Sequence, residues 1–532
     1  MGLGNGMASG SGRKTFRLVL VKPSHYDDDG YVIQWLRSPI PANSLACLYG
    51  LAQDASERQA LGADIALDVT AIDETNTRLR PERIAREVKA ADHGVVMLVG
   101  VQSNQFPRAL HIAQQLRDQG VTVGIGGFHV SGTLAMLPNI EPNVQRALDM
   151  GCFIYAGEAE EGRLDLILKD ALNDRLQPIY NFMKDLPGIA HVPTPHLPAS
   201  VIKRTYGANT SFDAGRGCPF QCSFCTIINV QGRKSRRRSP DDVETIVRAN
   251  AKQNIFHFFI TDDNFARNKD WEAIFDRLIH LREVEKINIK LIIQVDTLCH
   301  RIPNFIEKAA RAGVKRVFIG LENVSPDNLQ AAKKKQNKIT EYRMMLLAWK
   351  KVGVLTYCGY ILGFPNDTPE RIKRDIEVIK RELPVDLLEF FYLTPLPGSE
   401  DHKIRPQPRL HGASDHVQGG VGPGLPRGLG DLLLGRPCRD DPAPRRRHQR
   451  QRRQDHVRAQ LVHRLDPHRG HPPPRGRLRA PQAPARPAAR SADGIGVELL
   501  PALRRRADLE AGALALAHLP HAQALQVGAL RP

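Results

Sequence analysis

Short apolar runs alternate with helix-length amphipathic stretches through most of this chain. Between residues 208 and 403, six runs are rich in β-branched and aromatic residues, and helical stretches of suitable length separate them. Repeated strand and helix units form a parallel sheet through right-handed crossovers, so we predict a partial (β/α)6 TIM-type barrel with its chemistry at the carboxyl ends of the strands. The expected strands are residues 210–214, 256–261, 289–295, 316–321, 355–362 and 388–393.

The same alternation of apolar runs and helical stretches occurs earlier in the chain. Runs at 16–21, 94–101 and 121–125 predict buried strands, and residues 106–119 form an amphipathic helical pattern. We therefore expect an α/β domain with a Rossmann-like open parallel sheet over residues 16–189, preceded by a flexible N-terminus at residues 1–15. A proline-rich segment predicts a linker at residues 190–207, before a barrel domain at residues 208–403.

Residues 404–532 have a different composition. They hold 23 Arg, no Lys, 10 acidic residues and 17 of the 38 Pro, and they lack Phe, Trp, Tyr, Asn, Thr and Met. Such a segment buries too little apolar surface to offset its chain entropy, which predicts a disordered low-complexity tail. The missing residues mostly have A- or T-rich codons, so we also hypothesise that a frameshift has replaced the original C-terminus.

Most of the net charge of +18 lies in that tail, and the rest of the chain is nearly balanced. The basic segment 232–238 has no interleaved aromatic residues, so no nucleic-acid partner is required. No apolar run reaches 18 residues and no signal peptide is recognisable, which predicts a cytoplasmic protein without a transmembrane segment. Eight cysteines, three of them within eight residues, favour a metal site in a reducing compartment over disulfides.

The most specific motif is AGRGCPFQCSFC at residues 214–225. Thiolates hold iron-sulfur clusters, and three of them, here Cys218, Cys222 and Cys225, leave one iron of a 4Fe-4S cluster open for a further ligand. The alternatives are a zinc site and a cluster that only carries electrons. Zinc usually takes four ligands from paired C-x-x-C units, and no such pairing is present.

This motif, with Phe224 before the third cysteine, resembles the radical S-adenosylmethionine (SAM) superfamily. The resemblance implies that SAM chelates the open iron and is cleaved to a 5'-deoxyadenosyl radical. It also implies that polar residues at the end of the second strand hold the SAM amino group, which indicates Asp262, Asp263 and Asn264 in the stretch FFITDDNFARN. Alternatively, the two aspartates cap the helix that follows.

Later strands continue the resemblance as far as residue 402. It implies that Glu322 contacts the SAM ribose, that Gly359, Ile361 and Gly363 pass the adenine, and that Gln294 faces the same mouth. Glycine is useful where a backbone lies against a ligand. Alternatively, Glu322 is an ordinary loop carboxylate and the Gly363 segment an ordinary turn.

The first domain resembles the cobalamin-binding domain that precedes many radical SAM domains. The resemblance rests on the segments VTVGIGGFHVSG and IYAGEAEEG and implies that six residues lie near that cofactor: Ser103, Gly126, Gly127, His129, Gly157 and Glu158. The D-x-H-x-x-G motif of His-ligated cobalamin domains is absent, so a bound cobalt would lack a protein histidine below it. The alternative is a degenerate Rossmann-like domain without cobalamin.

Together these resemblances imply an enzyme, a cobalamin-dependent radical SAM methyltransferase that acts on an unactivated carbon of a small-molecule or lipid substrate. An electron donor such as flavodoxin or ferredoxin is its expected partner. The alternatives are a radical SAM rearrangement, cyclisation or other C–H chemistry without cobalamin, and a non-enzymatic iron-sulfur carrier or sensor. A methylthio-transferring enzyme would bring a second cysteine cluster, whereas the first domain holds only Cys47 and Cys152.

Overall fold

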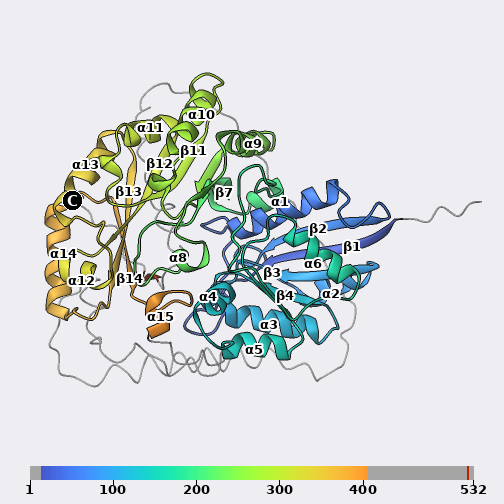
Figure 1. Cartoon of the computed structure of the whole chain (residues 1–532). Helices are drawn as coiled ribbons and strands as arrows, with labels where there is room; N and C mark the ends of the chain where they lie inside the picture. The colour runs from blue at the N-terminus through green and yellow to red at the C-terminus, as the bar shows by residue number, and fades with distance from the viewer. Residues whose placement is uncertain (1–12, 405–523, 526–532) are drawn as a thin grey trace, which may run out of the picture. The chain divides into compact units, whose positions relative to one another are not determined.

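The structure is a computed structural model that describes residues 13–404 and 524–525. Within these residues the chain forms two parallel sheets that belong to one compact unit, together with a two-stranded hairpin (Figure 1). The predicted α/β class with two parallel sheets is therefore confirmed. The predicted disordered tail and the frameshift concern residues that lie almost entirely outside the described ones.

The first sheet has the strand order β2-β1-β3-β4-β5-β6, and every pairing in it is parallel. The strands are β1 (Lys14–Lys22), β2 (Ile65–Asp73), β3 (His93–Leu98), β4 (Val123–Gly126), β5 (Phe153–Ala156) and β6 (Ile179–Asn181). The order reverses direction at β1, whose neighbours are β2 and β3. Open parallel sheets bind ligands beyond the carboxyl ends of the strands at such a point.

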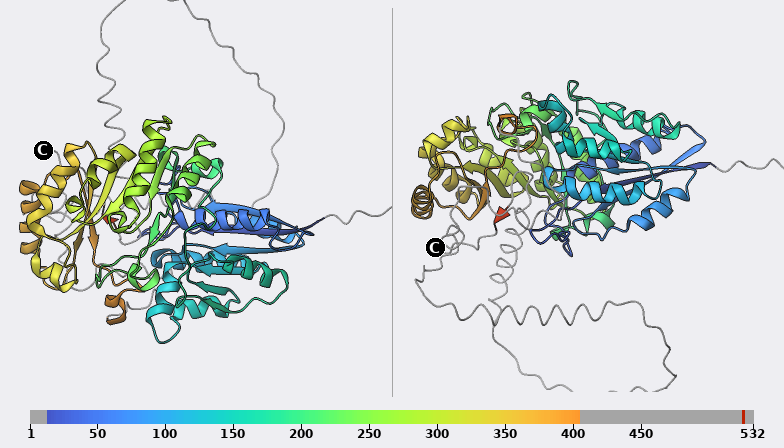
Figure 2. Two further views of the ribbon diagram at one scale, coloured as in Figure 1. Left: turned by 45° about the horizontal axis from the view of Figure 1, so that its top comes forward. Right: turned by 90° about the horizontal axis from the view of Figure 1, so that it is seen from below.

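Helices cover both faces of this sheet, as the right-hand view of Figure 2 shows. They are α1 (Asn43–Glu57), α2 (Pro81–Lys89), α3 (Phe106–Arg117), α4 (Phe128–Met136), α5 (Pro142–Asp149) and α6 (Arg163–Leu172). Alternate residues of β1 enter two different hydrophobic clusters, Val19 and Val21 one of them, Leu18 and Leu20 the other. Burial on both faces explains why β1 reads as a continuous apolar run.

The second sheet has the order β15-β14-β13-β12-β11-β10-β7, in which the six strands from β14 to β7 are parallel and β15 pairs antiparallel with β14. The strands are β7 (Asn209–Phe212), β10 (His257–Ile260), β11 (Lys290–Val295), β12 (Val314–Glu322), β13 (Leu355–Leu362), β14 (Leu387–Tyr392) and β15 (Ala524–Leu525). All six predicted barrel strands are present, and 355–362 agrees at both ends.

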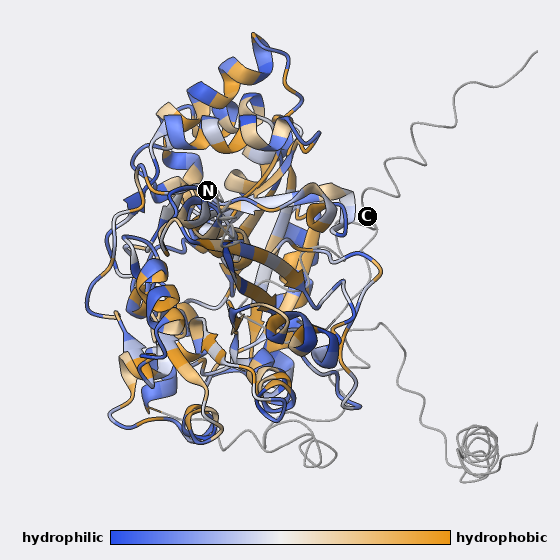
Figure 3. Ribbon diagram, turned by 90° about the vertical axis from the view of Figure 1, so that its right-hand side faces the viewer, coloured by the Kyte–Doolittle hydropathy of each residue, from blue (hydrophilic) through white to orange (hydrophobic). Residues whose placement is uncertain are grey.

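Figure 1 shows helices along the outer side of this curved sheet. The longer helices of this part are α9 (Pro240–Ala251), α10 (Trp271–Glu283), α11 (Phe305–Ala312), α13 (Tyr342–Lys351) and α14 (Pro369–Glu382). Shorter helices are α7 (Ala199–Ile202), α8 (Ile227–Val230), α12 (Pro326–Ala331) and α15 (Glu400–Ile404). In Figure 3 the helices carry hydrophilic and hydrophobic stripes, as expected of helices with one face on a core.

Local sequence explains where these helices begin. In α9 the Ser239 side chain accepts a hydrogen bond from the Asp242 amide, and the Asp242 side chain accepts one from the Ser239 amide, with Pro240 at the first helical position. In α14, Thr368 caps the Arg371 amide and Pro369 follows it. Proline fits a first helical position because its missing N–H has no helical partner there.

Turns of 3₁₀-helix connect several elements: η1 (Ser103–Gln105), η2 (Tyr206–Ala208), η3 (Phe265–Arg267), η4 (Cys299–Arg301) and η5 (Ile339–Glu341). β1 begins at Lys14, inside the stretch predicted to be a flexible N-terminus. Over the described part of the chain, no helix is both long and apolar enough to span a bilayer.

Candidate functional site

The three motif cysteines lie in a loop that a short hairpin closes. β8 (Gly215–Arg216) pairs antiparallel with β9 (Arg236–Arg237), and the Cys218 amide donates to the Gly232 carbonyl across the loop, 3.2 Å away. Gly217 lies between them with φ +93°, and a Cβ atom there would come within 2.7 Å of the Lys234 carbonyl oxygen. The backbone can therefore make this turn only with glycine. We call residues 215–237 the cysteine loop.

Inside the cysteine loop the three thiols affect one another electrostatically, and backbone hydrogen bonds hold the segment that carries them. The Cys225 amide donates to the Cys222 carbonyl at 3.2 Å, and the Ser223 amide donates to the Ala332 carbonyl at 3.1 Å. Burial raises the pKa of Cys218 to about 11, and it raises the pKa of Cys225 further, with Cys222 and Asp263 adding to the effect. Protonated thiols in such a place need a positive group before they become thiolate ligands.

The arrangement of the thiols bears on which metal group they fit. In the part of the chain that the structure describes, no three His, Cys, Asp or Glu side chains surround one point so as to hold a single metal ion. A cubane cluster takes each thiolate on a different iron, so its ligands need not converge on one point. Three neighbouring thiols in one closed loop fit a 4Fe-4S cluster better than a zinc ion.

Asp262 follows β10, and its side chain binds the start of the cysteine loop. Its Oδ1 accepts from the backbone amides of Ala214 and Gly215, both at 2.7 Å, and its Oδ2 accepts from Asn268 Nδ2 at 3.1 Å. Its side chain thus ties the end of β10 to the cysteine loop. Burial raises the pKa of Asp262 to about 7.

Asp263 acts electrostatically on the thiols instead. Burial, with the neighbouring Asp262, raises its pKa to about 7, and its carboxylate in turn contributes to the raised pKa of Cys218 and Cys225. Asn264, the third predicted residue, bonds to Asp296 after β11: its Nδ2 donates to Asp296 Oδ2 at 2.9 Å. Of the three predicted residues, Asp263 is the one whose charge raises the pKa of Cys218 and Cys225.

Glu322 ends β12 with φ +62°, a backbone conformation that is uncommon for a residue with a side chain. Its Oε1 pairs with Lys334 Nζ at 2.5 Å, and both side chains are only 12% exposed. The ammonium of Lys334 also lies 5.6 Å from the centre of the Phe224 ring. Gln336 Nε2 donates to Cys222 Sγ at 3.4 Å. Our sequence analysis identified neither Lys334 nor Gln336.

The remaining predicted SAM residues lie on neighbouring strands. Gly359 in β13 is covered by two rings, since a Cβ atom there would come within 3.0 Å of both Phe318 and Phe391. Phe224 of the cysteine loop packs against a hydrophobic cluster that includes Ile361 and Phe391. The cysteine loop therefore rests on the ends of β13 and β14.

Gly363 and Gln294 lie at the strand ends, where each donates a hydrogen bond to another residue of the protein. Gly363 has φ +91°, and its amide donates to Asp367 Oδ2 at 2.8 Å, as in a tight turn. Gln294 Nε2 donates to the Asp262 carbonyl at 3.3 Å. Both groups thus shape the rim of the barrel through hydrogen bonds within the protein.

In the first domain, His129 is held by packing. It is 2% exposed, its Nδ1 lies 3.3 Å from Ser103 Oγ, and its ring centre lies 4.2 Å from that of Phe106. Its Nε2 lies 3.6 Å from Glu141 Oε2. Neither ring nitrogen points to open space, so this histidine is placed as a buried structural group.

β4 ends at Gly126, and Gly127 follows it beside the loop after β3. Gly127 has φ +145°, and a Cβ atom there would come within 2.1 Å of the Val101 amide nitrogen. Glycine is thus required by the close approach of two backbones. Gly157, after β5, has φ +116° and its amide donates to Ser131 Oγ at 3.1 Å.

Glu158 joins the first domain to the cysteine loop. Its oxygens accept from Arg216 at 2.7 Å and from Arg236 at 2.5 Å, and Arg216 also binds Glu160 at 2.6 Å and Asp213 at 2.8 Å. Burial opposes ionisation of Asp213, but Arg216 and Arg238 hold its pKa well below its usual range. Arg216, which lies two residues before Cys218, thus binds three carboxylates. This role of Arg216 was not predicted from the sequence, because Glu158 and Glu160 are far from it in the chain.

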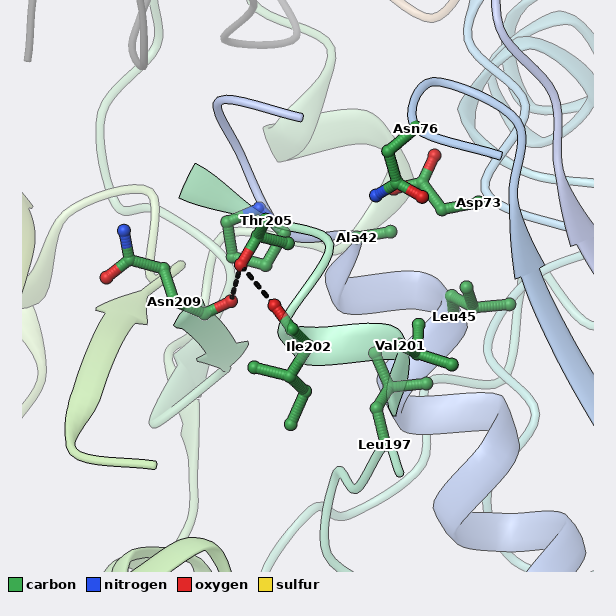
Figure 4. Close-up of a pocket in the computed structure, with 10 residues that line it drawn as sticks. Ala42, Leu45, Asp73, Asn76, Leu197, Val201, Ile202, Thr205 and Asn209 are labelled. Carbon is green, nitrogen blue, oxygen red and sulfur yellow. Dashed lines mark hydrogen bonds between the residues drawn. The ribbon is translucent and has the colours of Figure 1, made fainter. Parts of the chain in front are cut away.

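Figure 4 shows a small pocket in another part of the molecule. Its lining includes Ala42, Leu45, Asp73 and Asn209, and the Thr205 hydroxyl there donates to the carbonyls of Ile202 and Asn209. Asn209 begins β7, whereas the cysteine loop follows the other end of that strand. This pocket is therefore separate from the cysteine site.

Several curated relatives of the chain are methyltransferases. The chain is 28% identical over 322 residues to bacteriochlorophyllide d C-8(2)-methyltransferase of Chlorobaculum tepidum, covering 57% of this chain and 67% of the relative. It is 24% identical over 299 residues to hopanoid C-2 methylase of Rhodopseudomonas palustris, covering 54% of this chain and 53% of that protein. The chain thus spans about half the length of the second relative.

Among solved structures, the methyltransferase TsrM of Kitasatospora setae, a radical SAM protein with cobalamin and a [4Fe-4S] cluster bound, superimposes with a TM-score of 0.56. The match has 16% identity and covers 72% of this chain and 76% of TsrM, so it establishes a shared fold. The model of the radical SAM superfamily matches residues 214–379, which include the three cysteines and Asp263. The match to that superfamily thus covers the whole cysteine loop.

Proposed function

We propose that this protein is a radical SAM enzyme that depends on cobalamin and methylates an unactivated carbon atom. The observation that carries the proposal is the closed loop with Cys218, Cys222 and Cys225, which lies beside Asp263 at the carboxyl edge of a parallel sheet and falls within the superfamily match. When bound, a 4Fe-4S cluster with one open iron supplies the electron that cleaves SAM to a 5'-deoxyadenosyl radical.

Residues of the chain would have the following parts in SAM binding. The three cysteines hold the cluster, and Phe224 seats their loop on the barrel through the hydrophobic cluster with Ile361 and Phe391. Asp263 accepts hydrogen bonds from the SAM ammonium, because a cation in a water-poor site needs a charged acceptor. Asp262, Asn264 and Gln294 act by positioning the strand ends, since each is already bonded within the protein.

Glu322, Gly359 and Gly363 form the rest of the proposed SAM site, on the same rim. A ligand can lie against the backbone at Gly363, where the N–H is held by Asp367. Glu322 would reach a ribose hydroxyl while it stays paired with Lys334. The apolar rings around Gly359 would exclude water from the radical chemistry.

Cobalamin would supply the methyl group that is transferred. Support comes from the methyltransferase relatives, from the fold shared with TsrM, and from a sheet whose order reverses at β1. Loops with Ser103, Gly126, Gly127 and Gly157 leave the carboxyl edge of that sheet, where a cofactor is expected. His129 is buried among Ser103, Phe106 and Glu141, which fits a cobalt without a protein histidine ligand.

The proposal extends to the organisation and setting of the protein. It divides the chain into a cobalamin-binding-like domain at 16–189, a linker at 190–207, and a radical SAM core at 208–403. It places the enzyme in the cytoplasm, with a small-molecule or lipid substrate and with flavodoxin or ferredoxin as electron donor. The whole-protein activity belongs to this proposal, because the relatives are matched over only part of their length.

The test begins with full-length protein reconstituted anaerobically with iron and sulfide. We expect about four irons per chain and formation of 5'-deoxyadenosine from SAM with dithionite, measured by mass spectrometry. Cys222→Ala should reduce this product at least about a hundredfold, since an incomplete cluster cannot bind SAM productively. Cys152→Ala, which removes a buried thiol of the first sheet, should keep it.

Two further outcomes separate the alternatives. A cluster with no 5'-deoxyadenosine would support an electron carrier or sensor and would refute the enzyme. Product formation by a protein that shows no cobalamin absorbance after expression with the vitamin would support a radical SAM rearrangement or cyclisation. Methyl transfer from labelled SAM, in extracts of a host that lacks the gene, would identify the substrate.

A further inference from the structure

The segment after α12 places two polar side chains beside the proposed cluster. Lys334 and Gln336 both come from this segment, and both reach the cysteine loop. Lys334 is paired with Glu322 and lies over the ring of Phe224, the residue before Cys225. Gln336 is itself 7% exposed and donates to Cys222 Sγ.

Lys334 is the member of the ion pair that lies against the cysteine loop, since its ammonium is 5.6 Å from the centre of the Phe224 ring. Burial alone would lower the pKa of Lys334, but Glu322 and the thiols of Cys222 and Cys225 raise it above its usual value. A buried ammonium that keeps its proton is a fixed positive charge next to the three ligands.

A fixed positive charge has a definite consequence for a redox centre. Reduction of a 4Fe-4S cluster adds one electron, and hence one negative charge, to the group that the thiolates hold. In a buried site of low effective dielectric constant, a nearby cation stabilises the more negative state. Hydrogen bonds to the sulfur ligands act in the same direction, and both belong to the known determinants of cluster potential.

We propose that Lys334 and Gln336 are positioning residues that set the reduction potential of the cluster held by Cys218, Cys222 and Cys225, with Lys334 as the main contributor. The inference rests on the proposed function, because it concerns that cluster. It adds a role that the cysteine motif does not imply. The electron itself comes from an external one-electron donor, dithionite in the assay or a low-potential flavoprotein or ferredoxin in the cell.

The matched pair for the test is Lys334→Met and Lys333→Met. Lys333 is the preceding residue, but its ammonium binds the exposed carboxylate of Glu400 at 2.6 Å. Reconstituted full-length proteins are titrated without SAM, and the reduced cluster is counted by electron paramagnetic resonance at fixed potentials. For Lys334→Met we expect the ratio of reduced to oxidised cluster to fall about tenfold, a shift of about 59 mV for one electron. Lys333→Met should leave that ratio unchanged.

Three further variants make the sign of the effect diagnostic. Lys334→Arg keeps the charge and should retain the wild-type ratio. Glu322→Gln removes the counter-carboxylate and should raise the ratio, opposite to Lys334→Met. Gln336→Leu removes the N–H donor to Cys222 and should lower the ratio less than Lys334→Met does.

Failure of this inference is distinguishable from failure of the proposed function. If Lys334→Met binds iron as the wild type does and titrates at the same potential, the inference is overturned while the cluster stands. If Lys334→Met loads no iron, Glu322→Gln and Gln336→Leu decide, and wild-type potentials in both would overturn it. A wild-type protein that forms no 4Fe-4S cluster would overturn the proposed function and this inference together.

Discussion

The two sheets use their motif residues differently. At the rim of the second sheet, Asp263 raises the pKa of the Cys218 and Cys225 thiols, and Lys334 lies over Phe224 of their loop. Around the first sheet, His129 is enclosed by Phe106 and Ser103. The comparison shows that motif residues have two different roles. Some side chains act on the site, and others form the contacts that hold the loops around it.

Arg216 lies where these two regions meet, and its removal should have the largest effect. It is 8% exposed and pairs with Glu158, Glu160 and Asp213. Removing one partner from a buried ion network typically costs about 3–5 kcal/mol, because charges are left without compensation. We expect Arg216→Met to lower the free energy of unfolding by that amount in denaturant titrations and to reduce iron per chain.

The matched control is Arg58→Met. Arg58 also binds carboxylates, of Asp54 and Asp165, but its side chain is half exposed. Exposed ion pairs contribute about 0–1 kcal/mol, so this variant should remain close to the wild type. Equal losses in the two variants would mean that Arg216 does not couple the two regions.

Glu389 in β14 offers a pH-dependent contrast. It is 7% exposed, accepts from the Tyr357 hydroxyl, and burial raises its pKa to about 7. A carboxyl group with a raised folded-state pKa binds its proton more tightly when folded, so its contribution to stability declines as pH rises from about 4.5 to about 7.

Glu389→Gln should therefore gain stability relative to the wild type across that window, by up to about 3 kcal/mol above pH 7. Thermal unfolding measured from pH 5 to pH 8 checks this. Glu377→Gln changes an exposed carboxylate paired with Lys380 and should show no such window. A constant difference between Glu389→Gln and wild type over this range would contradict the burial argument.

Variants of the adjacent residues Asp262 and Asp263 should have different effects, one on the structure of the cysteine loop and the other on SAM binding. Asp263→Asn should weaken SAM binding about tenfold without changing iron content, because it removes a charged acceptor. Asp262→Asn should instead lower iron content, because it disturbs the acceptor of the Ala214 and Gly215 amides. Equilibrium dialysis with labelled SAM and iron analysis measure the two effects, and the same phenotype in both variants would refute the division.

The last prediction concerns His129. Since it packs against Phe106 and Ser103, His129→Ala should lower the free energy of unfolding by about 1–3 kcal/mol. We expect the cobalamin absorbance of the purified protein to be unchanged. A changed spectrum would show that the histidine contacts the cofactor, and the contrast between the two regions would be weaker.

Much of the fold could be predicted because it depends on local patterns. The run 355–362 is β13, and the helical pattern at 106–119 is α3, which ends at Arg117. Strands β2, β5 and β6 were not predicted individually. β2 has mostly half-buried side chains, and β5 and β6 have four and three residues, too few for a periodic signal.

The candidate site was predictable to the extent that it is contiguous in the chain. The spacing of Cys218, Cys222 and Cys225 carries its chemistry within eight residues. The groups that surround these thiols come from distant segments, for instance Lys334 and Gln336 beyond α12. A single sequence gives no signal for such a contact, because it arises from packing and not from spacing.

The sequence by itself determined the strand and helix order, the two-sheet class and the three-thiol loop, because periodicity and spacing act over short distances. Only the tertiary structure decided which polar groups remain directed at the cysteines. In the folded protein, Asp262 accepts hydrogen bonds from the loop amides, Glu158 pairs with Arg216, and Lys334 lies over the ring of Phe224. The physical reason is that each buried charge takes the partner that folding brings within hydrogen-bonding distance, however far apart the two lie in the chain.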